Sequence, residues 1–540
     1  MASETQAGPA GAALPLPPMK WDAWGDPALA RELPADIKAL LAAALGVTGD
    51  AGPGPTAAEV VLRPSLLAEA DLKALAAVVG EAHLSAADAD RLPRAGGKST
   101  PDLLRRRSRA PQDAPDAVVL PGSEDEIAAV LALCAERRIA VVPFGGGTSV
   151  VGGLDPERGG FTAVVSLDLR RFDRLLDLDA ISGEAVLGAG LTGPAAEALL
   201  AERGFELGHY PQSFRFATIG GFAATRSSGQ DSAGYGRFDE MVRGLRVVTP
   251  AGVLDLGRAP ASAAGPDLRE LFLGSEGTLG VITAVRVRVH PVPAVKAYEA
   301  WNFPDFTTGA DALRAVEQQG TGPTVIRLSD EAETAVNLAM TEQIGGEAAV
   351  SGCLAVTVFE GDAEQVTARH RLTRAVLLAA GGTSLGEAPA RAWEHGRFNA
   401  PYLRDSLLGA GALCETLETA TDWRRLPALR AAVTSALTTA LPGSLVLCHI
   451  SHVYPTGASL YFTVVAAQGP DPLAQWAAAK RATGDAIAAA GATITHHHAV
   501  GADHRPWMAD EIGELGVRIL HAVKAAVDPV GILNPGKLIP

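Results

Sequence analysis

Three glycine-rich loops, each joined to a short segment rich in β-branched residues, constrain the fold of this chain more than any other feature. They are Pro143–Gly153, Pro211–Gly229 and Gly274–Gly280. Because glycine has no Cβ, such loops let backbone N–H groups turn towards a phosphate, and their serines and threonines add hydroxyl donors. A single glycine-rich turn is often only a turn. Three of them together predict a protein that holds a large phosphate-bearing ligand.

The composition is that of a globular protein and excludes several other classes. The chain has 540 residues, 47% of them hydrophobic, and a formal charge of −15. This length suggests about two to four domains. The acidic balance, with a pI near 5.3, argues against nucleic-acid binding, which needs a basic face. Any anionic ligand must therefore be held by a few local groups.

The ends of the chain and its cysteines predict a protein of the reducing cytoplasm. The four cysteines lie far apart without CxxC spacing, so we expect neither a disulfide framework nor a thiolate zinc site. The N-terminus has no basic segment followed by an apolar one, and no stretch of 18 apolar residues follows. We expect no signal peptide and no membrane span.

Changes of pattern along the chain predict four regions. Residues 1–113 should form a disordered N-terminus and a helical preface, and residues 114–295 alternate short strands with helices, as α/β and α+β domains do. A second mixed region, 296–490, predicts a separate substrate domain. The last region, 491–540, contains a histidine loop and an amphipathic helix. Within these regions, residues 278–290 and 459–465 alternate apolar and polar side chains and predict half-buried strands.

The three loops, at these separations, resemble those of the FAD domain of the vanillyl-alcohol oxidase type of flavoprotein. The resemblance covers roughly residues 114–295. It implies an α+β fold, in which a two-subdomain FAD-binding domain is combined with an α/β substrate (cap) domain. On this resemblance the FAD contacts fall on Pro143, Phe144, Gly145, Gly146, Gly147, Thr148, Ser149, Gln212, Ser213, Phe214, Arg215, Phe216, Ala217, Thr218, Thr225, Arg226, Ser227, Ser228, Gly274, Ser275, Glu276, Gly277, Thr278, Leu279 and Gly280. We expect a β-branched residue at Gly146 to fill the space of the pyrophosphate and to be strained by a positive φ.

A fourth glycine motif points to a different nucleotide fold. Gly188–Gly193 is a literal GxGxxG that follows a predicted strand and opens a predicted helix. A dinucleotide fold of the Rossmann type also needs a buried strand that ends in an acidic residue after the helix. Here the short segment Gly204–Pro211 leads straight into the second loop instead. We therefore interpret Gly188–Gly193 as a turn between two subdomains of the FAD fold.

Outside the predicted FAD domain, the informative segments are Met19–Gly25, Val325–Asp330, Arg397–Asp405, Cys414–Ala420, Ser451-His452, Gly457–Phe462 and His496–Gly501. Together they resemble those of the alkyldihydroxyacetonephosphate synthase family, and the likeness runs from Trp21 almost to the C-terminus. It implies an enzyme that exchanges the acyl chain of acyl-dihydroxyacetone phosphate for a long-chain alcohol, which forms an ether-lipid precursor without net redox change. It also implies FAD bound without a covalent link, and Val141–Phe144 offers no histidine or cysteine for such a link.

The same resemblance assigns roles to six residues. Catalytic roles fall on Tyr461, Arg327, His496, His497 and His498, and binding of the substrate phosphate falls on Arg404. Taken without the resemblance, the tyrosine could be a packed sheet residue and the arginines could be surface ion-pairing residues. Three adjacent histidines could bind zinc, but consecutive side chains point in different directions. We favour a polar catalytic loop and predict no metal site.

A few residues depart from the family pattern and keep a second substrate class open. Gln212 stands where the animal synthases carry an acid, Thr416 stands where they carry serine, and Asn534–Lys537 looks like a segment of flavin-dependent hydroxyacid dehydrogenases. The alternative function is therefore an FAD-dependent dehydrogenase or oxidase of D-lactate, glycolate or a similar 2-hydroxy acid. A third hypothesis is a flavin-binding protein without catalysis.

The sequence also gives expectations for partners and location. The implied partner is a small lipid substrate, with peripheral membrane contact and a homodimer as further expectations. The C-terminus is not the peroxisomal signal Ser-Lys-Leu, so we expect a cytoplasmic enzyme.

Overall fold

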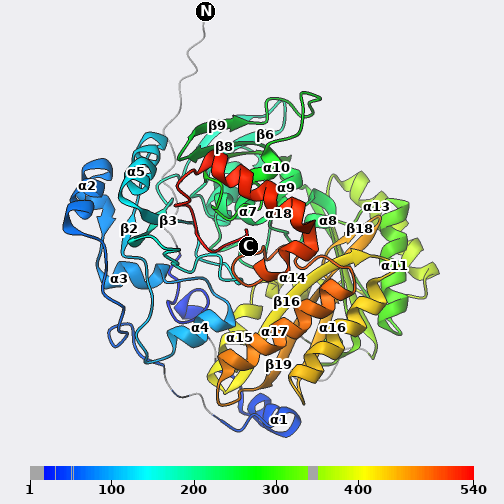
Figure 1. Cartoon of the computed structure of the whole chain (residues 1–540). Helices are drawn as coiled ribbons and strands as arrows, with labels where there is room; N and C mark the ends of the chain where they lie inside the picture. Colours follow the sequence, from blue (N-terminus) through cyan, green and yellow to red (C-terminus); the bar gives the residue numbers. More distant parts are fainter. Residues whose placement is uncertain (1–16, 31, 50–51, 53, 338–350) are drawn as a thin grey trace, which may run out of the picture.

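Four β-sheets and the helices around them make up the described chain (Figure 1). The computed structural model describes residues 17–30, 32–49, 52, 54–337 and 351–540. The predicted disorder of the N-terminus, up to residue 16, lies outside these residues. No helix within the described ranges is long and apolar enough to cross a membrane. The boundaries of the four predicted regions remain predictions.

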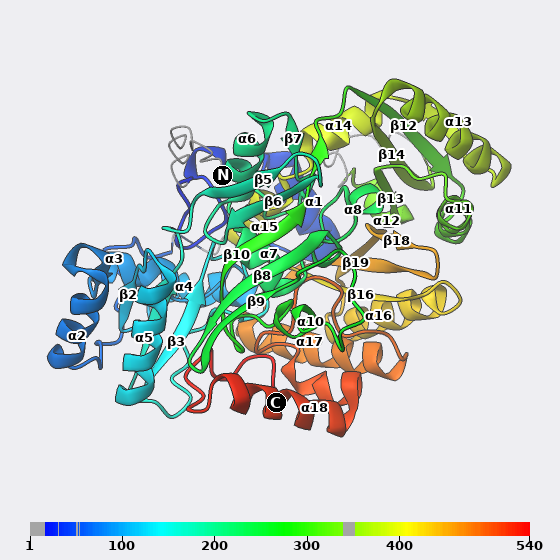
Figure 2. The ribbon, with the colours of Figure 1, turned by 90° about the horizontal axis from the view of Figure 1, so that it is seen from above.

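A four-stranded sheet lies beside the N-terminal helices (Figure 2). Its order is β1-β2-β4-β3, and β2, β4 and β3 are parallel, whereas β1 pairs antiparallel with β2. The bounds are β1 Leu84–Ser85, β2 Ala117–Val119, β3 Ile139–Phe144 and β4 Ala163–Asp168. Helices α2 (Glu69–Val79) and α5 (Glu124–Arg137) pack against each other next to this sheet. Because a parallel strand is covered on both faces, β3 is almost entirely apolar, and the first glycine-rich loop begins at its carboxyl end.

A five-stranded antiparallel sheet forms the second part of the predicted FAD domain. Its order is β5-β6-β10-β8-β9. The bounds are β5 Leu175–Asp179, β6 Glu184–Gly188, β8 Val242–Thr249, β9 Gly252–Leu256 and β10 Val281–Arg288. Strand β10 lies within the predicted strand 278–290, and Val285 and Val287 are buried while Arg288 is exposed. One hydrophobic core joins this sheet to the four-stranded sheet.

The third large sheet has eight antiparallel strands and belongs to the predicted substrate domain. Its order is β15-β12-β14-β13-β17-β19-β16, and β18 pairs with β19. The bounds are β12 Val295–Phe303, β13 Val325–Ser329, β14 Cys353–Gly361, β15 Thr383–Gly386, β16 Ala412–Asp422, β17 Leu445–Ile450, β18 Val453–Tyr454 and β19 Gly457–Ala467. One face packs against α11 (Phe306–Gln319), α13 (Ala363–Ala379), α16 (Leu426–Ala440) and α17 (Pro472–Ala489), as Figure 2 shows.

Alternation along the strands of this sheet decides which side chains face the FAD domain. In β19, Leu460, Phe462 and Val464 belong to the core under the helices. Because successive side chains of a strand point to opposite faces, Tyr461 and Thr463 face the other way. The predicted strand 459–465 lies within β19.

The remaining α-helices and strands connect and cover the sheets. They are α1 Ala35–Leu45, α3 Asp88–Arg91, α4 Thr100–Arg106, α6 Gly193–Ala201, α7 Ile219–Thr225, α8 Ser232–Tyr235, α9 Phe238–Met241, α10 Arg269–Phe272, α12 Glu331–Ala335, α14 Ala388–Gly396, α15 Ala400–Gly409, α18 Met508–Val527, β7 Phe205–Glu206 and β11 His290–Pro291. The segment after α18 returns to the four-stranded sheet, where Leu533 bridges Val141 of β3 in parallel.

The glycines of the GxGxxG motif lie at close approaches between backbone segments. A Cβ on Gly188 would lie 2.4 Å from the carbonyl oxygen of Phe172, and one on Gly190 would lie 2.1 Å from that of Leu169. These glycines let the turn between β6 and α6 pack on the chain that follows β4. The close packing of these backbone segments therefore explains the glycines of the motif in this structure.

Candidate active site

A large cavity lies between the glycine-rich loops and the free face of the eight-stranded sheet. Its volume is about 450 Å³, and its wall includes side chains of β17, β19, α15 and the histidine loop. Helix α1 contributes Ile37, Leu40 and Leu41 at an apolar part of this wall. The cavity therefore joins the predicted cofactor loops, the predicted catalytic residues and an apolar region.

Most residues of the three predicted FAD loops line this cavity. They are Pro143, Phe144, Gly145, Gly146, Gly147, Thr148, Ser149, Gln212, Ser213, Ala217, Thr218, Thr225, Ser227, Ser228, Glu276, Gly277 and Gly280. Eight others do not line it: Phe214, Arg215, Phe216, Arg226, Gly274, Ser275, Thr278 and Leu279.

Two of these eight residues make contacts elsewhere in the protein that support the loops. Arg226 pairs with Asp239 and Glu270, so its guanidinium is directed away from the cavity wall. Phe216 packs edge-on against Trp24 at a ring-centroid distance of 5.7 Å. Their contacts within the protein indicate a structural part in holding the loops.

Gly146 is required by the packing of one loop on another. A Cβ there would lie 2.1 Å from the carbonyl oxygen of Phe216 in the second loop. Our expectation of a positive φ at Gly146 is wrong, because the glycines of this loop with a positive φ are Gly147, at 71°, and Gly152, at 69°. Gly145 is equally close to the second loop, since its Cβ would lie 2.3 Å from Oγ1 of Thr218.

The cavity wall offers donors that suit a large polar ligand such as FAD. Nε2 of Gln212 and Oγ of Ser228 are buried and have no hydrogen-bond partner among the described residues. Buried polar atoms are normally paired, so these two require a ligand or water. Together with glycines that leave the backbone of the first loop uncovered, they fit the cofactor implied by the sequence.

Asn534 of the C-terminal tail connects two of the loops, a role that sequence reasoning missed. Its side-chain amide donates to the carbonyl oxygens of Gly153, at 3.0 Å, and Glu276, at 2.7 Å. The segment Asn534–Lys537, which suggested hydroxyacid dehydrogenases, therefore stabilises the cofactor loops in this structure.

Tyr461 lies on the cavity face of the sheet between two histidines. Its ring stacks on that of His449, with centroids 4.9 Å apart and an interplanar angle of 16°, and is nearly parallel to that of His497 at 6.0 Å. Burial raises the pKa of Tyr461 to about 12. The phenol therefore keeps its proton near neutral pH and is a proton donor.

Glu418 anchors the histidine loop. It lies on β16 directly opposite Tyr461 of β19 and is completely buried. Its carboxylate accepts the backbone N–H of His496 at 2.6 Å, of His497 at 3.2 Å and of His498 at 2.9 Å. Burial opposes its ionisation, but the three histidines and its hydrogen bonds hold the pKa of Glu418 well below its ordinary value. A fixed negative charge thus holds the loop beside Tyr461.

The three histidines are buried as neutral imidazoles. Burial lowers the pKa of each, and that of His498 falls to about 3. His497 and His498 line the cavity, whereas His496 lies behind them. Neutral imidazoles have a ring nitrogen that can accept a proton.

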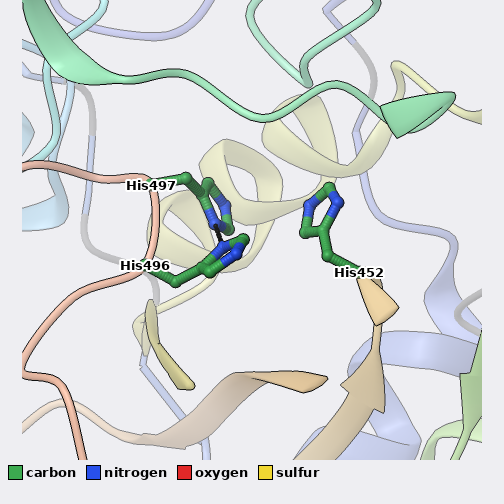
Figure 3. Close-up of side chains that lie close together, drawn as sticks. All are labelled: His452, His496 and His497. Atoms are coloured by element: carbon green, nitrogen blue, oxygen red, sulfur yellow. Dashed lines mark hydrogen bonds between the residues drawn. The ribbon is translucent and has the colours of Figure 1, made fainter. Parts of the chain in front are cut away.

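His452, His496 and His497 form a cluster whose ring nitrogens lie within 4.8 Å of one another (Figure 3). Nε2 of His496 lies 2.6 Å from the hydroxyl of Tyr454, and its Nδ1 lies 3.0 Å from Nδ1 of His497. Two nitrogens that share a tetrahedral zinc ion would be about 3.3 Å apart, with both lone pairs aimed at the ion. Because both nitrogens of His496 already have partners, the geometry favours a hydrogen-bonded cluster.

Arg404 lies on α15 at the cavity wall, and part of the hydrogen-bonding capacity of its guanidinium is used within the protein. Nη1 donates to the carbonyl oxygen of Lys98 at 2.6 Å, and Nη2 donates to Asp405 at 3.2 Å. Nε is buried without a partner among the described residues. Burial disfavours the charge, but Asp405 and Glu415 more than offset this and raise the pKa of Arg404. The side chain therefore holds a permanent positive charge at the cavity wall.

Arg327 reaches the cavity from β13 and pairs with the fully buried Glu333 of α12. Glu333 in turn lies against His449, which also lines the cavity. Sequence reasoning missed His449, Glu333, Glu418 and His452 as parts of the site. The available signal was a histidine in the otherwise apolar β17, namely His449, and an acidic residue beside apolar ones in β16, namely Glu418.

Comparison with known proteins shows which family has a sequence similar to that of this chain. Residues 115–257 match the family model described as FAD binding domain, and residues 292–538 match that of FAD linked oxidases, C-terminal domain. An alkyldihydroxyacetonephosphate synthase of Trypanosoma brucei brucei is 32% identical, and the alignment covers 97% of this chain and 92% of that protein. The chain belongs to the alkyldihydroxyacetonephosphate synthase family. The predicted family is thereby confirmed.

Solved structures of similar proteins confirm the predicted fold. A synthase of the family superposes with a TM-score of 0.82 at 29% identity, covering 96% of this chain and 99% of that chain. A p-cresol methylhydroxylase superposes with a TM-score of 0.68 at 17% identity, covering 88% of this chain and 98% of that chain, which bears on the fold alone. The α+β fold of the vanillyl-alcohol oxidase type and the FAD cofactor are confirmed.

Proposed function

We propose that this chain exchanges the acyl chain of acyl-dihydroxyacetone phosphate for a long-chain alcohol, as the name of its family indicates. The observation that carries the proposal is the single cavity, in which cofactor loops, a tyrosine–histidine cluster, an arginine and an apolar wall meet. FAD would be held by the three glycine-rich loops and would supply an electrophilic ring for the exchange. The residues of the chain do the binding, positioning and proton transfer.

Substrate binding needs an anion site and an apolar site. Arg404 supports the first, because its Nε is the unpaired donor of a charged guanidinium at the cavity wall. Ile37 and Leu41 of α1 and Leu407 of α15 support the second, because all three line the same cavity. Apolar pockets with a few polar groups are typical sites for such ligands. The phosphate would lie near the arginine and the hydrocarbon chain along α1 and α15.

Proton transfer needs a donor and an acceptor in the same place. The pKa of the Tyr461 phenol is raised to about 12, so the phenol is protonated, while the pKa of the neighbouring His498 is lowered to about 3, so its imidazole is neutral. Their rings are edge-to-face at 5.6 Å. A protonated phenol beside a neutral imidazole provides one proton donor and one proton acceptor.

The alternative of a 2-hydroxyacid dehydrogenase or oxidase is weaker. The synthases of the family match nearly the whole chain, including the substrate domain. The residues that suggested the alternative, around Asn534, contact the cofactor loops. Peripheral membrane contact, a homodimer, a cytoplasmic location and a non-covalent flavin link remain our proposals.

The test is an assay of the purified holoenzyme with palmitoyl-dihydroxyacetone phosphate and hexadecanol. We expect free palmitate and an ether product in equal amounts, with no net reduction of the flavin. A second arm supplies D-lactate and an artificial electron acceptor. Reduction of the acceptor without any palmitate release would refute the proposal and support the dehydrogenase.

A further inference from the structure

His449 lies on the cavity face of the sheet but has no role in the site described so far. It follows Cys448, whose side chain belongs to the helix-side core, so alternation along β17 directs the imidazole of His449 to the cavity. Its ring lines the cavity and stacks on Tyr461 at 4.9 Å. The residue is therefore placed where a substrate would meet the proposed acid.

A buried carboxylate fixes the orientation of this histidine. Oε2 of Glu333 lies 2.9 Å from Nδ1 of His449, and Glu333 is completely buried. Its other oxygen, Oε1, accepts hydrogen bonds from Arg327 and from the hydroxyl of Ser329. Arg327 and His449 together hold the pKa of Glu333 far below its ordinary value, although burial acts in the opposite direction.

The contacts of Glu333 determine which nitrogen of His449 carries the proton. A carboxylate oxygen can only accept, so Oε2 needs a donor, and Nδ1 of His449 is the ring nitrogen beside it. Nη2 of Arg327 also lies 3.1 Å from Nδ1, but it is closer to Oε1 and donates there. Nδ1 therefore carries hydrogen, and Nε2 keeps its lone pair. Within the described residues, the side-chain hydrogen bonds of His449 both involve Nδ1.

We propose that His449 is a catalytic base that removes a proton from the substrate, and that Glu333 and Arg327 are positioning residues that act through it. The inference rests on the proposed function. A neutral histidine backed by a carboxylate through Nδ1 is an arrangement that suits general base catalysis. The proposal also gives Arg327 a physical role, since it holds Glu333 in place.

The proton transfer balances without a further reactant. In acyl-dihydroxyacetone phosphate the carbon that carries the ester is next to the ketone. When its C–H bond breaks, the proton forms a bond to Nε2 of His449, and the electron pair moves into the carbonyl group to give an enolate. The negative charge of Glu333 stabilises the imidazolium that results. Return of a proton from Nε2 regenerates the substrate, and no oxidant is consumed.

His496 and His498 are less suited to this step. Both nitrogens of His496 already have partners, and burial lowers the pKa of His498 to about 3. The pKa of His449 is also lowered by burial and by Arg327, but Glu333 raises it in part. The titratable and charged groups that face His449 are Arg327 of β13, Glu333 of α12, Tyr461 of β19 and His497 of the histidine loop.

The experiment measures deuterium uptake from D₂O at the ester-bearing carbon, with the alcohol omitted, in parallel with palmitate release. The variant His449→Asn keeps a donor near the place of Nδ1 but lacks Nε2. We expect its exchange and turnover to fall by about two to four orders of magnitude, with flavin content and thermal melt unchanged. The control His521→Asn changes an exposed histidine of α18 and should behave like the wild type.

A second variant separates chemistry from structure. Glu333→Gln removes the charge that raises the pKa of His449, so the limb of the pH–rate profile that reports a deprotonated base should move to lower pH at a lower plateau. Glu333→Asp keeps the charge and should leave the limb in place. If Glu333 had a purely structural role, its replacement would not move this limb of the pH–rate profile.

The possible results distinguish a failure of the role of His449 from a failure of the proposed function. If the wild type releases palmitate and His449→Asn exchanges deuterium within about threefold of it, His449 is not the base, while the proposed function stands. If the wild type itself releases no palmitate, the proposed function fails, and the role of His449 fails with it. Unchanged pH profiles in both Glu333 variants would overturn the positioning role.

Discussion

Replacing Glu418 by glutamine should release the histidine loop while the rest of the protein stays folded. Oε1 of Glu418 accepts two backbone N–H groups, those of His497 and His498, and Oε2 accepts that of His496. A glutamine has one oxygen, which can replace Oε1. Its amide nitrogen would then face the N–H of His496, and because both groups are donors no hydrogen bond can form between them.

The size of the effect follows from this count. At least one buried N–H loses its acceptor, and such a group costs about 1–3 kcal/mol. This penalty falls on a single loop and should increase its open population by about 5- to 150-fold. Opening of the loop also moves His497 and His498 away from the cavity wall, so turnover should decrease as well.

Amide hydrogen exchange followed by mass spectrometry measures this opening directly. We expect faster exchange in peptides that contain residues 495–498, with unchanged protection of β16 and β19 and with full flavin content. The matched control is Glu511→Gln, because Glu511 is exposed and accepts from Thr493 and Ile494 at the start of the same segment. Exposed contacts of this kind contribute little.

Protection of residues 496–498 within twofold of the wild type, together with full turnover, would refute the anchoring role of Glu418. The histidine loop would then be held by its contacts with Tyr454 and the sheet alone.

The remaining predictions concern the cofactor, the substrate, the acid and the effect of pH. Gly146→Val should lose flavin, because its side chain would press on the carbonyl of Phe216. The ratio of flavin absorbance at about 450 nm to protein absorbance at about 280 nm should fall to that of the apo-protein, and normal flavin content in a soluble variant would contradict this. Arg404→Lys should lower kcat/KM for acyl-dihydroxyacetone phosphate about tenfold or more, since lysine replaces a planar fork by a point charge; equal values would make the arginine structural. Tyr461→Phe should lower turnover by about two to four orders of magnitude with an unchanged melt, and activity within about threefold would remove the tyrosine from the chemistry. Because the pKa values of His498 and His504 are lowered to about 3, the unfolded state binds protons first, so the free energy of unfolding should fall as the pH drops from about 6.5 towards about 3; melts that are equal at both ends of this range would contradict the buried neutral state.

The cofactor loops and the orientation of the proposed acid could be predicted from local sequence. The glycines, serines and threonines at 143–149 and 274–280 can be recognised as phosphate-binding loops from a few consecutive residues, because backbone geometry near a phosphate is a local requirement. The alternation of apolar and polar residues around Tyr461 likewise places its ring on one face of a strand before any partner strand is known. The family resemblance then identified which polar residues on such faces belong to the site.

The proton-transfer network was decided by pairing between distant segments. Glu418 meets Tyr461 because β16 and β19 pair in one particular register, and a shift of one residue would turn its carboxylate to the helix side. His449 meets Glu333 across more than a hundred residues of chain, through the packing of β17 beside α12. Burial and contacts with buried partners together set the protonation states of these groups, and both arise only when the two sheets and the loops enclose the cavity. A linear pattern contains neither the register nor the burial, so the sequence by itself determined the parts of the site, and the tertiary structure decided which of them act on one another.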